Sequence, residues 1–441
     1  MKHYFIKTYG CQMNVHESEK LAGMLKSLGY TETESMEQAD VIVFNTCCIR
    51  DSAEQKVLGN IGSTKKLKKL NPNLIVAVCG CMAQEDGRKD LFKEKYPYVN
   101  IVFGTHNLHL FKEYLINYQQ SHKNIYDIWE KEAAINEDVE MYRTSNNNAW
   151  VNIMYGCNNF CTYCIVPYVR GRERSRTITD IVNEVKQLVA EGYKIVTLLG
   201  QNVNSYGNDF KDGTNFAMLL KELCKIPGDF RIKFMTSHPK DLTDEVINVI
   251  ATEPKLSKVI HLPVQSGSNR ILKLMNRNYT VEHYLGLIEK IKANVPNYFI
   301  STDLIVGFPT ETEEDFMDTY NLVKKVEYGG VFGFIYSKRT GTIAEKMDGQ
   351  IDDQTKHDRV NRLLSLSKSL IKEQNQKLIG TINEALIEQK TTNGYLATLD
   401  NGKNVVLITD ETLTIPSFVN VKVNSLERNK LICELVNKGE N

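Results

Sequence analysis

The chain lacks several features that would place it in a specialised class of protein. Its 54 lysines and arginines are balanced by 54 aspartates and glutamates, so no overall electric field draws in nucleic acid. No stretch approaches the roughly 18 uninterrupted apolar residues of a membrane-spanning helix. Residues 1–7 carry charges where a secretory signal would need an apolar core. There is also no low-complexity tract and no strong short-period repeat.

What remains is a globular chain of 441 residues, 42% hydrophobic and 24% charged, which is long enough for two or three domains. It has ten cysteines but no signal segment, which indicates a reducing compartment. In such a compartment clustered cysteines serve metals or redox chemistry more often than disulfides. We therefore expect a cytoplasmic protein without a membrane partner. Any basic surface must be local, and the arginine-rich residues 170–176 are our candidate for a binding role.

The most informative stretch places Cys157, Cys161 and Cys164 in a C-x-x-x-C-x-x-C pattern. So short a loop can fold with its three thiolates converging on one metal face. A closed structural zinc site needs four ligands, and no fourth cysteine or histidine is close by. Three thiolates on a four-iron cluster instead leave one iron free to bind something else. The alternative is a set of structural or zinc-binding cysteines.

This spacing, with Tyr163 before the last cysteine, resembles the signature of radical S-adenosylmethionine enzymes. The resemblance implies that the open iron holds the amino and carboxylate groups of S-adenosylmethionine. It also implies that an electron from the cluster cleaves this cofactor to a carbon radical.

Residues 1–125 are predicted to form a doubly wound parallel sheet, because short strands alternate with helical stretches. The expected strands are 3–8, 41–46, 74–78 and 100–103, and the expected helices are 17–28 and 55–70. Cys11, Cys47 and Cys81 follow the first three strands. Because ligands bind at the carboxyl ends of such strands, these cysteines should meet at one edge and hold a second cluster.

The strings around these cysteines, residues 8–14, 45–50 and 80–84, together with the cysteine loop resemble the methylthiotransferase family over essentially the whole chain. In that family the first domain holds an auxiliary four-iron cluster, and Cys11, Cys47 and Cys81 match its ligands. Cys48 and Cys79 lie beside matching positions. We interpret both as buried small apolar residues, although Cys79 and Cys81 together could also grip a metal.

A solvated linker is expected over residues 126–145, followed by six strand–helix units in residues 146–376. The expected strands are 150–155, 194–199, 231–236, 258–263, 298–306 and 331–336, and the helices that follow most of them are 179–191, 215–225, 243–251, 280–294 and 313–326. Six such units predict a partial (β/α)6 barrel of the triosephosphate-isomerase type, with its chemistry at the carboxyl ends of the strands.

Distinctive strings fall at those ends. By resemblance to the family, the S-adenosylmethionine pocket is lined by Tyr163, Gly200, Gln201, Thr236, Ser237, Gln265, Asp303 and Gly307. We interpret His261 as a core residue, His238 as a turn residue, and Thr310 with Glu313 as a capping box. Relatives usually have glycine at position 310 and proline near Lys338 and Thr340, so this chain departs from the family in those loops.

A helix over residues 356–378 leads to the last unit, residues 377–441, where the apolar pattern changes to period two. The expected strands are 383–389, 394–398, 405–408, 419–423 and 431–436. They predict a small antiparallel β-barrel of oligonucleotide-binding style. Its place in the chain resembles the RNA-binding (TRAM-like) domain of radical methylthiotransferases, while a stabilising appendage is the alternative. Cys224 and Cys433 are interpreted as core residues.

The resemblance implies a transferase that uses two four-iron clusters and two S-adenosylmethionine molecules per turnover. The expected substrate is isopentenyladenosine beside the anticodon of tRNA, methylthiolated at C2. The expected reductant is a flavodoxin or ferredoxin, and the protein is expected to be a monomer. No side chain beyond the cluster ligands is assigned to catalysis, since radical chemistry belongs to the cofactor. The N-terminal sheet edge should close over the barrel mouth.

Three alternatives remain open at this point. Two are sister methylthiotransferases, which act on threonylcarbamoyl-adenosine in tRNA or on a ribosomal-protein aspartate. The third is a non-catalytic iron–sulfur protein that binds RNA or transfers electrons.

Overall fold

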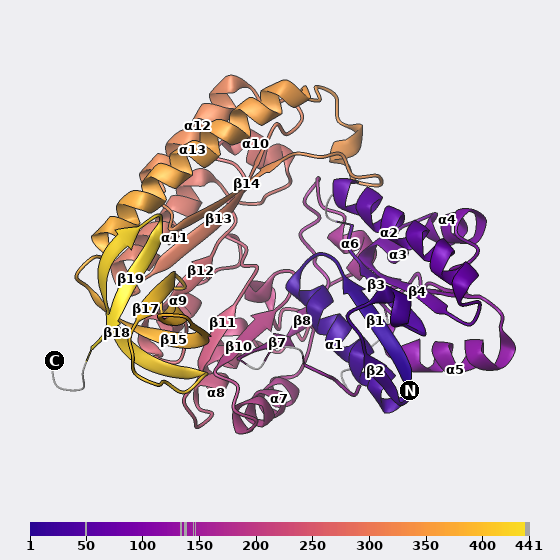
Figure 1. The fold of residues 1–441 in the computed structure, drawn as a ribbon. Helices are drawn as coiled ribbons and strands as arrows, with labels where there is room; N and C mark the ends of the chain where they lie inside the picture. The colour runs from indigo at the N-terminus through magenta and orange to yellow at the C-terminus, as the bar shows by residue number, and fades with distance from the viewer. Residues whose placement is uncertain (49–50, 133–134, 136–138, 144, 146, 437–441) are drawn as a thin grey trace.

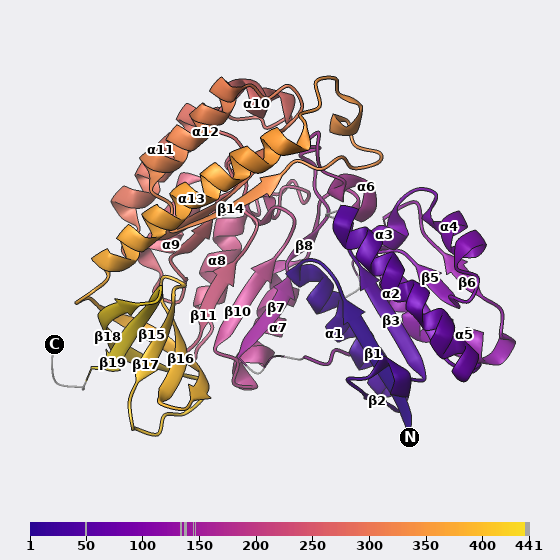
Figure 2. The same ribbon diagram turned by 45° about the horizontal axis from the view of Figure 1, so that its top comes forward.

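Three structural units follow one another along the chain in the computed structural model, which describes residues 1–48, 51–132, 135, 139–143, 145 and 147–436 (Figure 1). The N-terminal unit and the C-terminal barrel lie on opposite sides of the central unit (Figures 1 and 2). Within the described residues no helix has the length and apolar character needed to cross a membrane.

The N-terminal unit is a six-stranded parallel sheet in the order β2-β1-β3-β4-β5-β6. Its strands are β1 (Lys2–Thr8), β2 (Tyr30–Glu32), β3 (Val41–Thr46), β4 (Ile75–Gly80), β5 (Ile101–Phe103) and β6 (Ile125–Asp127). Its helices are α1 (Gln12–Ser27), α2 (Asp51–Leu70), α3 (Cys81–Gln84), α4 (Arg88–Lys95) and α5 (Phe111–Ser121). The central strands β3 and β4 are buried throughout, as their uninterrupted apolar runs require. The doubly wound sheet is confirmed.

Helix α1 begins at Gln12 and not at the expected residue 17. Its first turns carry Asn14, Glu17 and Lys20, which are all buried. Polar residues at buried positions hide the apolar periodicity on which the expectation depended. They are buried because the central unit covers this part of the helix, where Arg170 binds Glu17.

The central unit contains six parallel strands in two sheets, β11-β10-β7 and β12-β13-β14, joined by a bridge between Ile232 and Leu256. The strands are β7 (Asn148–Asn152), β10 (Ile195–Leu199), β11 (Arg231–Phe234), β12 (Val259–His261), β13 (Phe299–Val306) and β14 (Gly330–Ile335). The outer helices are α7 (Ile178–Ala190), α8 (Phe216–Cys224), α9 (Asp244–Thr252), α11 (Val281–Asn294) and α12 (Glu313–Val326). The partial (β/α)6 barrel is confirmed.

The expected strand 150–155 is divided between β7 and the short β8 (Met154–Tyr155). The other short elements of the central unit were not predicted, namely β9 (Arg174–Ser175), α6 (Val166–Arg170) and α10 (Asn269–Leu274). The helix α12 begins with a capping box between Thr312 and Asp315. The expected box between Thr310 and Glu313 is therefore wrong. The backbone N–H of Thr310 donates instead to the carbonyl of Gly349 at 2.7 Å, so Thr310 belongs to the preceding turn.

The last unit begins after α13 (Asp353–Lys377) and is a closed barrel in the order β15-β16-β17-β19-β18. Its strands are β15 (Ile382–Thr391), β16 (Gly394–Leu399), β17 (Asn404–Ile408), β18 (Ser417–Glu427) and β19 (Lys430–Leu435). The five-stranded barrel is confirmed, and Cys433 lies in its core. Closure requires β17 and β19 to pair in parallel, so the barrel is not antiparallel throughout.

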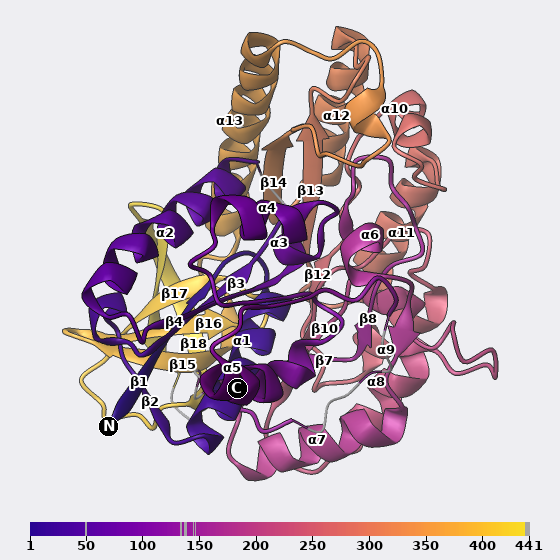
Figure 3. The ribbon, with the colours of Figure 1, turned by 90° about the vertical axis from the view of Figure 1, so that its right-hand side faces the viewer.

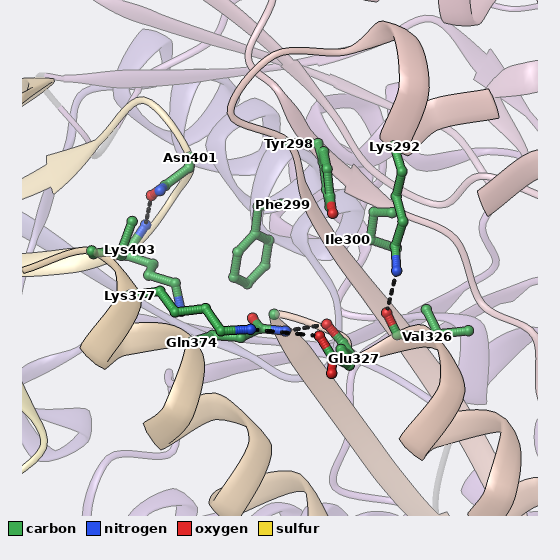
Figure 4. A pocket seen from close by; sticks show the side chains of 12 residues that line it. Lys292, Tyr298, Phe299, Ile300, Val326, Glu327, Gln374, Lys377, Asn401 and Lys403 are labelled. Carbon is green, nitrogen blue, oxygen red and sulfur yellow. Dashed lines mark hydrogen bonds and ion pairs between the residues drawn. The ribbon is translucent and has the colours of Figure 1, made fainter. Parts of the chain in front are cut away.

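This barrel packs against the amino-terminal ends of the central strands. Arg231, the first residue of β11, donates to Glu384 of β15 at 2.6 and 3.0 Å. A cavity of about 190 Å³ lies in the same region, between the start of β13, the end of α13 and the terminal barrel (Figure 4). Its lysines are engaged, since Lys403 donates to Asn375 at 2.6 Å and Lys292 to the Val326 carbonyl at 2.9 Å. The cavity is thus part of a domain interface, at the opposite end of the strands from the cysteines.

The segment expected to be a solvated linker has structure in the residues that can be described. Its first residues, 126–127, complete the edge strand β6. Further on, the backbone N–H of Tyr142 donates to Glu19 at 2.9 Å. Arg143 lies 3.7 Å from Glu19 of α1 and 2.8 Å from Glu184 of α7. Residues 130–132, 140 and 142 are exposed, as a solvated connector would be, while Tyr142 and Arg143 also fasten the first unit to the second.

Candidate functional site

Three cysteines of the N-terminal unit meet at one sheet edge. Cys11 is the N-cap of α1 after β1, Cys47 follows β3, and Cys81 opens α3 after β4. Because β1, β3 and β4 are adjacent parallel strands, the cysteines share their carboxyl edge. Gly10 has φ +102°, and a Cβ there would lie 2.6 Å from the Cys47 sulfur, so glycine permits the close approach.

A buried arginine lies among these thiols. Arg170, at the end of α6, donates to Glu17 at 2.6 and 3.2 Å and to Asn14 at 2.9 Å. Only 4% of its surface is exposed, and after a hydrogen bond with Cys48 its charge is the next contribution that lowers the pKa of Cys81. An adjacent cation stabilises thiolate over thiol, which favours metal ligation. Helix α6 directly follows the loop that carries Cys157, Cys161 and Cys164, so Arg170 connects this loop with the N-terminal cysteines. The helix α3 packs against α6 (Figure 3).

Cys157, Cys161 and Cys164 lie in the loop between β8 and α6. Gly156 allows this loop to form, because it has φ +80° and a Cβ there would lie 2.0 Å from the Arg172 carbonyl oxygen. Burial, with a smaller effect of the Cys161 charge in the same direction, raises the pKa of Cys157 to about 11 and that of Cys164 to about 12. The three sulfurs are therefore close enough to affect one another in an enclosed site.

Polar side chains hold this loop both from within it and from the segment around Arg277. Arg277 donates to the Cys161 sulfur at 3.5 Å, and Asn159 to the Cys157 sulfur at 3.6 Å. Asn276 donates to the carbonyls of Asn159 and Phe160 at 3.0 and 3.1 Å. N–H donors aimed at ligand sulfurs are a common way of tuning an iron–sulfur cluster.

Most of the residues expected to bind S-adenosylmethionine surround the carboxyl ends of the strands. Gly200 follows β10, Thr236 and Ser237 follow β11, Gln265 follows β12, and Gly307 follows β13. Thr236 has φ +69° and Gln265 has φ +71°, unusual backbone conformations that often mark functional sites. Tyr163 packs instead in a small apolar cluster with Met275 and Phe308, and Asp303 lies inside β13, three residues before its end.

The two cysteine sets face one barrel mouth. Gln201, after β10, donates to the sulfur of Met13 beside Cys11, and Lys20 donates to Tyr155 at 3.3 Å. The expectation that the N-terminal sheet edge closes over the mouth is confirmed by these contacts.

The comparisons with known proteins agree with this geometry. Residues 151–323 match the model of the radical SAM superfamily, and residues 3–104 match an uncharacterised protein family, UPF0004. A tRNA-2-methylthio-N(6)-dimethylallyladenosine synthase of Clostridium tetani is 52% identical over 421 residues, which cover 96% of this chain and 91% of that protein. The protein with the same name from Thermoanaerobacter pseudethanolicus is 51% identical, covering 98% and 93%. The chain belongs to this family of synthases.

Solved structures of low sequence identity share the fold of this chain over most of its length. The radical S-adenosylmethionine methyltransferase TsrM from Kitasatospora setae, with cobalamin and a [4Fe-4S] cluster bound, has a TM-score of 0.58 at 10% identity. The alignment covers 78% of this chain and 74% of TsrM. It supports the arrangement of the units and nothing more specific.

The residues of this synthase-family chain suit the groups that the family implies. Each cysteine set offers three soft thiol ligands, the kind that iron–sulfur clusters take. At the mouth, Gln201 Oε1 and Ser237 Oγ are buried and have no hydrogen-bond partner among the described residues. Buried polar atoms of this kind require a partner, which a polar cofactor would supply.

Cys48 and Cys79, which neighbour the candidate ligands in sequence, lie in different surroundings. Cys79 points into the core formed by α1 and α5, as expected. Cys48 lies in the apolar cluster that contains Cys81. A hydrogen bond between Cys48 and Cys81 lowers the pKa of Cys81 to about 7, with burial acting against it and the charge of Arg170 acting with it. The same bond raises the pKa of Cys48. Cys48 is buried as predicted, but it also hydrogen-bonds to a candidate ligand. Residues 49 and 50 of the same string lie outside the described part.

Sequence reasoning missed Glu311, which shapes the Gly307 turn. Glu311 accepts from the Gly307 backbone N–H at 2.7 Å and from Arg359 of α13 at 2.8 Å. Burial raises the pKa of Glu311 to about 7. A glutamate four residues after a glycine could have been noticed, but its partner Arg359 is distant in sequence.

Two residue interpretations are corrected. His261 does not point into the helix-packed core. It is half-buried, its Nδ1 lies 3.0 Å from Ser301 Oγ, and its Nε2 lies 3.5 Å from Asp303. In the arginine-rich segment, Arg170 and Arg176 are 4% and 6% exposed and pair with Glu17 and Glu184. These two therefore have structural roles and cannot contribute to a basic binding surface.

Proposed function

We propose that this chain methylthiolates C2 of isopentenyladenosine beside the anticodon of tRNA. The observation that carries the proposal is the placement of two cysteine sets at one barrel mouth. It is supported by near-complete alignment, at 51–52% identity, with relatives whose name describes this modification.

In this proposal Cys157, Cys161 and Cys164 hold one four-iron cluster, and Cys11, Cys47 and Cys81 hold a second. When bound, the clusters and S-adenosylmethionine supply one-electron cleavage, a carbon radical and the site of sulfur transfer. The protein binds and orients the cofactor and the substrate, and it excludes water from the site. Arg277 and Asn159 donate to ligand sulfurs, and Arg170 places a cation beside the second set.

The proposed S-adenosylmethionine pocket comprises Tyr163, Gly200, Gln201, Thr236, Ser237, Gln265, Asp303 and Gly307. Gln201 and Ser237 offer unpartnered buried oxygens to the polar end of the cofactor. Tyr163 contributes through packing beneath the cysteine loop, since it lies in an apolar cluster.

We also propose the working partners of the enzyme. The anticodon loop enters the mouth, residues 377–441 bind RNA, and a flavodoxin or ferredoxin supplies electrons. The enzyme acts as a cytoplasmic monomer. The proposed domains are residues 1–125, 146–376 and 377–441, with residues 126–145 connecting the first two.

Nucleoside mass spectrometry of tRNA from cells that lack the protein tests the substrate. Isopentenyladenosine should accumulate without its methylthio group, and reintroducing the gene should restore the modification. Methylthiolated threonylcarbamoyl-adenosine and the ribosomal aspartate modification should persist. If the isopentenyl nucleoside is still methylthiolated while one of the others disappears, the substrate assignment is wrong.

A further inference from the structure

A buried ion pair joins the central unit to the N-terminal unit beside the N-terminal cysteines. Arg170 ends α6 and Glu17 lies in α1, and each exposes 4% of its surface. Arg170 Nη1 donates to Glu17 Oε1 at 2.6 Å, and its Nη2 donates to Oε2 at 3.2 Å. A buried ion pair is a weak source of stability, because the loss of hydration opposes the attraction between the charges. Its place beside the thiols indicates a role beyond holding the two units together.

Asn14 fixes the guanidinium of Arg170 beside these cysteines. Asn14 is fully buried, and its Nδ2 donates to the carbonyls of Tyr9 and Thr46 at 2.7 and 3.0 Å. Its Oδ1 is thereby turned toward the arginine and accepts from Arg170 Nη2 at 2.9 Å. The sulfur of Cys11 lies 3.8 Å from the same oxygen. The guanidinium therefore has little freedom to turn away from the thiols.

The ion pair acts on the sulfur of Cys81. Arg170 donates a hydrogen bond to this sulfur. After the hydrogen bond with Cys48 and the effect of burial, the two charges of the pair are the next largest effects on the pKa of Cys81, and they act in opposite directions. Burial lowers the pKa of Arg170, but the charges of Cys81 and Glu17 raise it well above its usual value. The guanidinium therefore stays charged next to a candidate ligand.

We propose that Arg170 is a positioning residue that acts through Cys81 and, opposed by Glu17, sets the reduction potential of the second cluster. Reduction adds negative charge to a cluster. A buried cation nearby therefore stabilises the reduced form and raises the potential, while a carboxylate lowers it. Because Arg170 belongs to the central unit, this effect exists only when the two units are docked. The inference rests on the proposed function, since it needs a cluster on the N-terminal cysteines.

The alternative is that the pair only fastens the two units. A buried arginine of the same segment is an example of a pair away from the N-terminal cysteines. Arg176, which is 6% exposed, donates to Glu184 at 2.7 Å and to the Asn152 carbonyl at 2.8 Å, and both partners belong to the central unit. A pair that only fastens affects stability and leaves the energy of cluster reduction unchanged. The reduction potential therefore separates the two cases.

The test is a redox titration of the reconstituted full-length enzyme, followed by electron paramagnetic resonance. The two reduction steps are assigned with variants that replace one cysteine set by alanine, since each should keep one cluster. Arg170→Gln should make reduction of the second cluster about tenfold less favourable, which lowers its potential by about 59 mV for one electron. Glu17→Gln should shift the same potential upward. Arg170→Lys keeps the charge and should recover most of the potential lost in Arg170→Gln.

Arg176→Gln is the matched control, because it also breaks a buried ion pair, and it should leave the potential of the second cluster unchanged. Opposite shifts for Arg170→Gln and Glu17→Gln support the inference, since a loosened contact between the units would move both in the same direction. No shift in Arg170→Gln, or shifts of the same sign in both variants, would overturn it.

Loss of the second cluster from Arg170→Gln leaves the decision to Glu17→Gln, which retains the cation. An upward shift in Glu17→Gln then supports the inference, and an unchanged or lower potential overturns it. Failure of the proposed function is distinguishable, because it would appear in the wild type, as a single cluster per chain or as the absence of methylthio product.

Discussion

Thr310 adopts a backbone conformation that its side chain disfavours. It has φ +65°, where a β-branched side chain is strained, and the resemblance noted above implies glycine at this position. We predict that Thr310→Gly raises the free energy of unfolding by about 1 kcal/mol, measured by urea denaturation. The variant cannot form the hydrogen bond from Arg270 to the Thr310 hydroxyl at 3.2 Å, but this bond is exposed and contributes little. Thr310→Ala retains a Cβ and should give no such gain, so equal stabilisation by both variants would contradict the strain argument.

His238 makes stability depend on pH. It is 5% exposed, its Nδ1 accepts from the Lys240 backbone N–H at 3.2 Å, and burial lowers the pKa of His238 to about 2. The folded state therefore keeps this imidazole neutral, while the unfolded state binds a proton below about pH 6.5. Its contribution to stability is complete above that pH and is lost as the pH falls, by up to about 1.4 kcal/mol per unit.

The variant His238→Asn keeps an acceptor for Lys240 but cannot titrate. Between pH 5 and 7.5 its unfolding free energy should change less with pH than that of the wild type. Identical slopes would mean that the buried imidazole is protonated in the folded enzyme as well.

Single-residue positions were predictable where spacing and topology fixed them. The cysteine positions followed from spacing and from topology, because parallel strands bring their carboxyl ends together. Arg170 and Glu17 could not be paired from the sequence, since 153 positions separate them and only the docking of two units brings them together. The facing of Phe308 and Tyr336, aromatic residues that follow β13 and β14, could not be predicted from the sequence either. Both are buried and stack edge-on against each other at 5.4 Å, so neither lines the mouth.

At the level of elements, β15 has two roles, which a truncation and a point variant can separate when they are compared. It is part of the proposed RNA-binding barrel, and it covers the amino-terminal ends of the central strands through Glu384 and Arg231. Removing residues 378–441 should weaken tRNA binding and flatten its dependence on salt, because phosphate contacts release counterions. Filter binding over a range of salt concentrations measures both.

The control is full-length Glu384→Ala, which removes the ion pair with Arg231 between the two units but keeps the terminal barrel. It should lower thermal stability while preserving the salt slope. If truncation leaves affinity and slope unchanged, the terminal barrel serves stability alone.

Long elements with one apolar face were predicted closely, and α12 was predicted at its observed bounds. The errors concentrate where burial is unusual or elements are short. β2 and β6 have three residues each and include an acidic residue, so they carry less apolar pattern than the equally short but wholly apolar β5. The start of α1 was missed because its polar side chains are buried by another unit. Both errors arise from tertiary contacts that no local pattern records.

For the whole molecule, the two cysteine sets should load iron independently. Replacing Cys157, Cys161 and Cys164 by alanine should halve the iron content of anaerobically reconstituted protein and abolish S-adenosylmethionine cleavage. Replacing Cys11, Cys47 and Cys81 should also halve the iron but leave cleavage intact, because only the first set adjoins the proposed cofactor pocket. Iron analysis and detection of 5′-deoxyadenosine measure the two effects.

Cys224→Ala is the control, since Cys224 is half-buried on α8, away from both sets. It should change neither quantity. Four irons in the wild type, or zinc in place of iron, would contradict two separate four-iron sites.

The helix α13 links two distant parts of the molecule without a break. Near its start Lys356 packs against Gly307 at the mouth, and at its end Lys377 lies 3.7 Å from Glu327 beside the terminal barrel. Its 25 residues span about 37 Å. One inserted residue would turn everything beyond it by about 100° and advance it by about 1.5 Å. Over evolutionary time, insertions and deletions should therefore accumulate in the turns on either side of α13 and be purged from the helix itself.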